Sequence, residues 1–169
     1  TRTREMSRLG GLWRVMPWTA SLFALGAVAI SGLPPLNGFV SEWLVYLGLF
    51  DATLAHGPEA WAAIPAAILL GVTSALALAC FIKVCGVVFL GVARSDAAAH
   101  AHESGPAMRG AMLVLAVGCV AIGLGPVLFW PAVARAVESW KPAWPASAAA
   151  APLAALSIVH LVVAGLALA

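Results

Sequence analysis

Glu42 is the residue of this chain best placed to do chemistry. It is the only charged side chain in the apolar run from Met16 to Phe50, and intramembrane carboxylates are rare because they are costly. Desolvation there favours the neutral acid, whereas the positive end of a helix favours the anion by only ~0.3–1 kcal/mol. We therefore expect Glu42 to take up and release protons where water reaches it. The alternative is a structural acid hydrogen-bonded to a neighbouring helix.

Lys83 is the second candidate for proton transfer. It lies inside the apolar run 61–91, too deep for its ammonium to reach the interface easily. A desolvated lysine can lose its charge, so Lys83 could also change protonation state. The alternative is a lysine whose stem packs on lipid while its head reaches the interface. The spacing does not show whether Lys83 meets Glu42.

The residues before Glu42 predict an interrupted helix. Proline removes a backbone donor and clashes with the preceding turn. Lipid cannot satisfy the freed backbone groups, so such a break must be buried in protein or face water. A break with an acid nearby is how transporters build ion sites. We expect Asn37 to cap the second half-helix, and the break to comprise Gly32, Pro34, Pro35, Asn37 and Gly38.

The remaining polar residues predict no catalytic, metal or cofactor site. His100 and His102 precede Glu103 in a polar, alanine-rich loop, where i,i+2 spacing is typical of solvent-exposed side chains. His160 lies alone in an apolar run and is expected to hydrogen-bond across helices rather than relay protons. No nucleotide loop or zinc motif is present. The three cysteines fit no metal or disulfide pattern and are expected to pack: Cys80, Cys85 and Cys119.

Composition predicts an all-α, polytopic membrane helix bundle. Of 169 residues, 63% are hydrophobic and 9% charged, against about 25% charged in soluble domains. A net charge of +2 without a basic run argues against nucleic-acid binding.

About four spans are expected, one of them discontinuous. Positive-inside counting places the first segment and the loop 92–109 on the cytoplasmic side. The expected order is a basic segment 1–16, a broken transmembrane helix 17–50, a span 61–91, a cytoplasmic loop 92–109, an uninterrupted span 110–130, an interfacial segment 131–150 and a span 151–169.

The string from Ala29 to Trp43 resembles a known family. Its Leu-Pro-Pro-Leu-Asn-Gly-Phe-Val-Ser-Glu-Trp core is similar to the proton-conducting membrane subunits. These are the antiporter-like subunits of NADH–quinone oxidoreductase, the Mrp cation/proton antiporters and the membrane subunits of group 4 hydrogenases. With Cys80 to Lys83 and Phe89 to Gly91, the form looks most like the hydrogenase-4 component B and formate hydrogenlyase branch. The resemblance covers about the first 95 residues.

The resemblance implies a bundle of two inverted five-helix repeats, each with one broken helix. Residues 17–50 would be the broken helix of the second repeat. Glu42 would take its ionisable position and end a hydrated proton path toward the non-cytoplasmic side. The rest of the relay would lie upstream of Thr1, so we expect a C-terminal piece of a longer protein.

These inferences together predict a proton-translocating subunit of a redox-driven complex in a bacterial inner membrane. It would have no cofactor and no catalytic site of its own, although the complex would be an oxidoreductase. Its partners would be other membrane and hydrophilic subunits of a hydrogenase or respiratory complex, lipid and protons. Two alternatives stay open: an Mrp-type Na⁺/H⁺ antiporter subunit, and a non-conducting membrane anchor of a hydrogenase.

Overall fold

All regular secondary structure in the described part of the chain is helical, as the sequence predicts. The computed structural model describes residues 5–54, 57, 60–140 and 146–168. The start of the basic segment (1–4), most of the turn at 55–59, and residues 141–145 of the expected interfacial segment lie outside these ranges.

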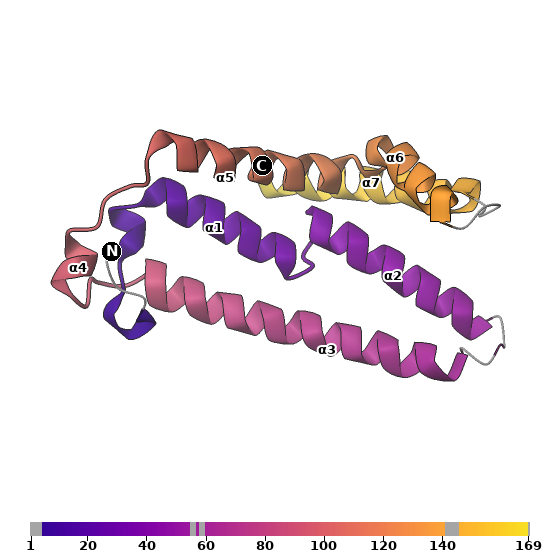
Figure 1. Ribbon diagram of the computed structural model, residues 1–169, viewed down its shortest axis with the longest axis horizontal. Helices are drawn as coiled ribbons and strands as arrows, with labels where there is room; N and C mark the ends of the chain where they lie inside the picture. The colour runs from indigo at the N-terminus through magenta and orange to yellow at the C-terminus, as the bar shows by residue number, and fades with distance from the viewer. Residues whose placement is uncertain (1–4, 55–56, 58–59, 141–145, 169) are drawn as a thin grey trace.

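Helices α1 (Pro17–Ile30) and α2 (Asn37–Leu54) follow one another along nearly the same line, with a loop between them (Figure 1). Their 14 and 18 residues correspond to about 21 and 27 Å at 1.5 Å per residue. Each is shorter than the ~30 Å apolar layer of a bilayer. In series they are long enough to cross it once.

The end of α1 is set by Gly32, because its backbone adopts the left-handed conformation (φ 66°). Its N–H donates to the Ala29 carbonyl at 3.3 Å, and the N–H of Leu33 donates to the Val28 carbonyl at 3.3 Å. These two bonds form a Schellman cap, the helix ending that glycine favours. Pro34 and Pro35 then prevent the helix from resuming at once.

Within the described residues, two helices are long and apolar enough, by length and composition, to cross a membrane unaided. Helix α3 (Ala60–Val84) continues through a π-helical turn, Cys85–Phe89, to a total of 30 residues. Helix α5 (Pro106–Leu124) has 19 residues. By length and composition α1 and residues Pro152–Leu166 are shorter apolar helices.

The segment 110–130, expected as one uninterrupted span, is divided in the structure. Helix α5 ends at Leu124, and α6 (Pro126–Trp140) starts after a single non-helical residue, Gly125. Proline disfavours the helical conformation in the residue before it and is well tolerated in the first turn of a new helix. Consequently, the first ten residues of the expected interfacial segment belong to α6. Helix α7 (Ala146–Leu168) begins five residues earlier than expected.

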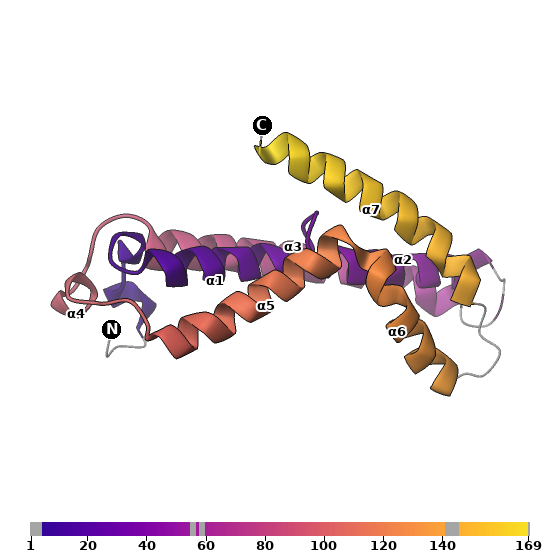
Figure 2. The same ribbon diagram turned by 90° about the horizontal axis from the view of Figure 1, so that it is seen from above.

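The helices pack around the α1–α2 pair. Helix α3 runs along one side of it and α5 along the other, and α6 turns away from α5 after the break (Figures 1 and 2). Helix α7 starts beside α2 and diverges from the other helices toward its C-terminal end (Figure 2). A small apolar core of Val40, Leu153 and Leu156 joins α7 to α2.

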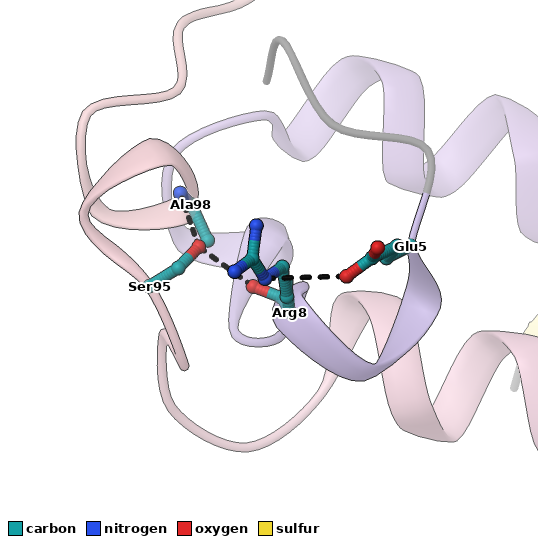
Figure 3. A network of polar contacts seen from close by, with 4 residues as sticks. All are labelled: Glu5, Arg8, Ser95 and Ala98. Carbon is teal, nitrogen blue, oxygen red and sulfur yellow. Dashed lines mark hydrogen bonds and ion pairs between the residues drawn. The ribbon is translucent and has the colours of Figure 1, made fainter.

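One end of the molecule is closed by the N-terminal segment and the chain between α3 and α5. The Gly11 N–H donates to the Leu90 carbonyl at 2.9 Å. The Ser95 hydroxyl donates to the Arg8 carbonyl at 2.8 Å and accepts from the Ala98 N–H at 3.3 Å (Figure 3). An exposed ion pair between Arg8 and Glu5 adds little stability.

An apolar cluster lies beneath these contacts. Its buried members are Leu12, Ala20, Val88, Phe89 and Ala98. The described part of the basic segment and the chain between α3 and α5 therefore lie at one end of the molecule.

Candidate functional site: a carboxyl group at an interrupted helix

Glu42 lies in the second turn of α2, half-buried, beside the last turn of α1. Its Oε1 accepts a hydrogen bond from the Ser74 hydroxyl of α3 at 2.6 Å. This distance is typical of a hydroxyl that donates to a carboxylate. The N-terminal end of α2 is only one turn away, and the N-terminal end of a helix attracts negative charge.

Glu42 lines a recess of about 540 Å³ between α1, α2 and α3, which we call the Glu42 recess. A water molecule occupies about 30 Å³ in the liquid, so the recess has room for several. Its polar lining comes from Asn37, Ser41, Glu42, Thr73 and Ser74. Most of the lining is apolar, but these polar groups give water the hydrogen-bond partners that it needs in order to occupy a cavity.

Two glycines allow the half-helices and the carboxyl group to approach closely. A β-carbon on Gly32 would overlap Oε2 of Glu42. A β-carbon on Gly38 would overlap the carbonyl oxygen of Ala29, at the end of α1. The residue type at position 38 therefore follows from contact, and that at position 32 from contact as well as from its left-handed backbone.

Asn37 does not play the capping role expected from the sequence. It is the first residue of α2, and within the described structure its side-chain Oδ1 is buried and accepts no hydrogen bond. The prediction was wrong because α2 starts one residue earlier than a cap at Asn37 requires. Asn37 and Ser41 instead line both the Glu42 recess and a second cavity of about 280 Å³ toward α6.

Lys83 does not meet Glu42. It is exposed in the last turn of α3, nine residues beyond Ser74, a separation of about 13 Å along the helix axis. It is absent from the lining of the Glu42 recess.

His160 makes the cross-helix hydrogen bond that the sequence predicts. Its Nδ1 lies 2.7 Å from the Gly123 carbonyl oxygen, and its side chain is 1% exposed. Because a carbonyl can only accept, Nδ1 carries the proton of this hydrogen bond. Nε2 is buried without a hydrogen-bond partner among the described residues. The same Gly123 packs on the α1–α2 loop so tightly that a β-carbon would overlap the Pro35 carbonyl.

Glu103 has a structural role that the sequence did not reveal. Its carboxylate accepts from the Trp18 N–H at 2.9 Å, from the Thr19 N–H at 3.3 Å and from the Thr19 hydroxyl, so it caps the start of α1. The hydrogen bond from Thr19 is the main reason that the pKa of Glu103 lies below its ordinary value of 4.5. His100 and His102 are exposed, and no metal-binding cluster occurs among the described residues.

Comparison with known proteins places the chain in a family. Residues 1–60, which include the whole break, match the family model of the NADH:quinone oxidoreductase/Mrp antiporter transmembrane domain. The chain belongs to this family of antiporter-like membrane subunits. Similarity within the family also extends beyond the break, into the helices that the sequence motifs did not cover.

Three relatives illustrate the range of the family. Hydrogenase-4 component B of Escherichia coli K12 is 38% identical over 148 residues, 87% of this chain and 22% of that protein. Formate hydrogenlyase subunit 3 of the same strain is 35% identical over 138 residues, 81% of this chain and 23% of that protein. Na⁺/H⁺ antiporter subunit A1 of Staphylococcus saprophyticus is 29% identical over 132 residues, 76% of this chain and 16% of that protein. The chain thus spans less than a quarter of the length of each relative.

Proposed function

We propose that this chain is part of a proton-translocating membrane subunit, in a redox-driven complex of the hydrogenase-4 or NADH–quinone oxidoreductase type. Glu42 is the residue that takes up and releases the proton. The bilayer is a bacterial inner membrane, and the partners are the electron-transferring and membrane subunits of the complex. Similarity to two subunits named for hydrogenase-4 and formate hydrogenlyase supports the type of complex.

The observation that carries the proposal is the position of Glu42. A lone carboxyl group lies where a helix is interrupted, with a hydroxyl partner at 2.6 Å, and it lines a recess that has room for water and several polar groups in its wall. A carboxyl group that neutralises its charge by exchanging a proton with water costs far less free energy than a bare charge moved through the bilayer. The second cavity, which shares Asn37 and Ser41 with the recess, supports a continuation of the path along α2.

We also propose Lys83 as a second proton-transfer residue. Since it lies about 13 Å along α3 from Ser74, any exchange with Glu42 requires intervening water or another side chain. Replacement of Lys83 by Gln tests this role separately from that of Glu42.

The proposal is tested by proton uptake into inverted membrane vesicles that contain the full-length complex with Glu42→Gln. We expect normal assembly and uptake reduced about 100-fold, the lower range for loss of an acid–base group. Glu138→Gln, which removes an exposed carboxylate from α6, should leave uptake unchanged. Normal uptake by the Glu42→Gln complex would overturn the proposal.

Similarity to a Na⁺/H⁺ antiporter subunit supports a second candidate function, cation/proton antiport. Proton flux in the same vesicles separates the two. An antiporter requires sodium on the opposite side of the membrane, whereas a redox-driven pump requires the electron donor. A non-conducting anchor predicts that Glu42→Gln and Glu42→Ala change assembly alone.

A further inference from the structure

The Ser74 hydroxyl has one proton and two acceptors within reach. Its Oγ lies 2.6 Å from Oε1 of Glu42 and 3.1 Å from the carbonyl oxygen of Leu70, one turn back along α3. A hydroxyl donates one hydrogen bond and accepts two. The shorter contact lies in the range for donation to a carboxylate, and the longer one exceeds the usual O–H···O distance. In this geometry the hydroxyl proton therefore points at Glu42.

Protonation of Glu42 reverses the roles of donor and acceptor in its contact with Ser74. Once Oε1 carries a proton it becomes a donor, and two donors cannot share one hydrogen bond. Rotation about the Cβ–Oγ bond of Ser74 removes the conflict, since the hydroxyl proton then points at the Leu70 carbonyl. A lone pair of Oγ is left free to accept from the Glu42 carboxyl group.

We propose that Ser74 is a positioning residue that holds the Glu42 carboxyl group in one place in both protonation states, by turning its hydroxyl between Glu42 and Leu70. Ser74 keeps its own proton throughout. The transferred proton comes from water in the recess, binds Oε1 of Glu42 and returns to water. This role rests on the proposed function of Glu42.

Gly32 restricts the position of the other carboxyl oxygen of Glu42, Oε2. Since the Gly32 α-carbon lies against Oε2 while Ser74 binds Oε1, the group is held between α1 and α3. Among the described residues, the other titratable side chains nearby are Cys119, which lines the recess, and Tyr46, one turn further along α2 and facing Gly71 of α3. A group fixed in this way exchanges protons without reorienting at each cycle.

Thr73 provides a matched control within the same turn of α3. Thr73 also lines the recess, and its hydroxyl also donates one turn back, to the Leu69 carbonyl at 2.8 Å. It makes no hydrogen bond to Glu42. Loss of either hydroxyl removes the same chemical group from the same recess, and only one of them touches the carboxyl group.

The experiment is infrared difference spectroscopy of the full-length complex across a pH range. The C=O stretching band of protonated Glu42 is identified by its loss in Glu42→Gln. We expect Ser74→Ala to move this band and Thr73→Ala to leave it in place. Ser74→Thr should restore it, because threonine keeps the hydroxyl and also bonds the carbonyl one turn back. An unmoved band in Ser74→Ala would overturn the proposal, as would absence of the band at every pH.

Proton uptake gives a second readout of the same variants. We expect Ser74→Ala to slow uptake about tenfold, which corresponds to ~1.4 kcal/mol, and Ser74→Thr to recover most of the rate. The two proposals fail in different ways. Normal uptake by Glu42→Gln contradicts the function of Glu42, whereas an unmoved band in Ser74→Ala contradicts the role of Ser74 even where Glu42→Gln abolishes uptake.

Discussion

Gly32 lies so close to Glu42 that any β-carbon at position 32 would overlap the Glu42 carboxylate. The two residues are ten positions apart in sequence and on opposite sides of the helix break. One glycine therefore does two things: its left-handed backbone ends α1, and its missing side chain leaves room for the carboxyl group.

We predict that Gly32→Ala abolishes proton uptake while costing little in folding. A left-handed backbone costs a non-glycine residue about 1–2 kcal/mol, which lowers the thermal stability of the complex without preventing assembly. The added methyl group displaces the carboxylate from Ser74, so uptake by vesicles should fall toward that of Glu42→Gln.

Gly26→Ala is the matched control for that substitution. Gly26 also lines the recess from α1, but a β-carbon there meets no atom within 4 Å. Alanine is favoured over glycine within a helix by roughly 0.5–1 kcal/mol, so stability should rise slightly and uptake should persist. Equal loss of uptake in both variants would contradict the role assigned to Gly32.

The contact between Gly123 and the α1–α2 loop gives a second prediction. A β-carbon on Gly123 would overlap the Pro35 carbonyl and the backbone of Leu36. We expect Gly123→Ala to destabilise the complex by about 1–3 kcal/mol, the usual cost of an overpacked contact. Thermal unfolding of the purified complex measures this loss. Gly118→Ala on the same helix, with open space around it, should not reduce stability.

The Glu103 cap predicts a pH dependence of stability. The pKa of Glu103 is lowered in the folded protein by the Thr19 hydrogen bond, so the folded state favours the ionised carboxylate. The cap therefore stabilises the fold at pH values above the ordinary 4.5 and is lost as the pH falls through the lowered value.

Thermal unfolding of wild type and Glu103→Gln between neutral and acidic pH checks this prediction. The variant should be less stable at neutral pH, and the difference should shrink below the ordinary carboxyl pKa. A difference for Glu103→Gln that stays constant with pH would contradict the capping role.

The sequence predicted the interrupted helix well because the cause is local. Glycine and two adjacent prolines restrict the backbone whatever surrounds them, so α1 could end only near Gly32. The second interruption, at Gly125 and Pro126, has the same local cause but was missed, because the surrounding run 110–130 is uniformly apolar. Hydropathy indicates how long an apolar segment is, but it does not show whether the helix is continuous.

The partners of these residues could not be predicted, because they come from distant parts of the chain. Ser74 is 32 residues from Glu42, and Glu103 is 84 residues from Thr19. The adjacent hydroxyls Thr73 and Ser74 within an apolar run were the available signal for a polar recess. No spacing rule predicts that these hydroxyls lie near Glu42, and none predicts that Lys83 lies far from it.

Proton transfer by Glu42 depends on water reaching the recess, and the reactivity of Cys119 measures this directly. Cys119 lines the Glu42 recess, whereas Ala121, two residues along α5, lines a cavity bounded only by apolar side chains. The measurement is the rate at which a charged, water-soluble thiol reagent modifies each position in membranes containing the full-length complex, with Ala121→Cys made in a Cys119→Ser background. We predict modification of Cys119 to be faster by about tenfold or more, since the reagent requires a hydrated thiolate. Equal rates, or no reaction at Cys119, would contradict the account.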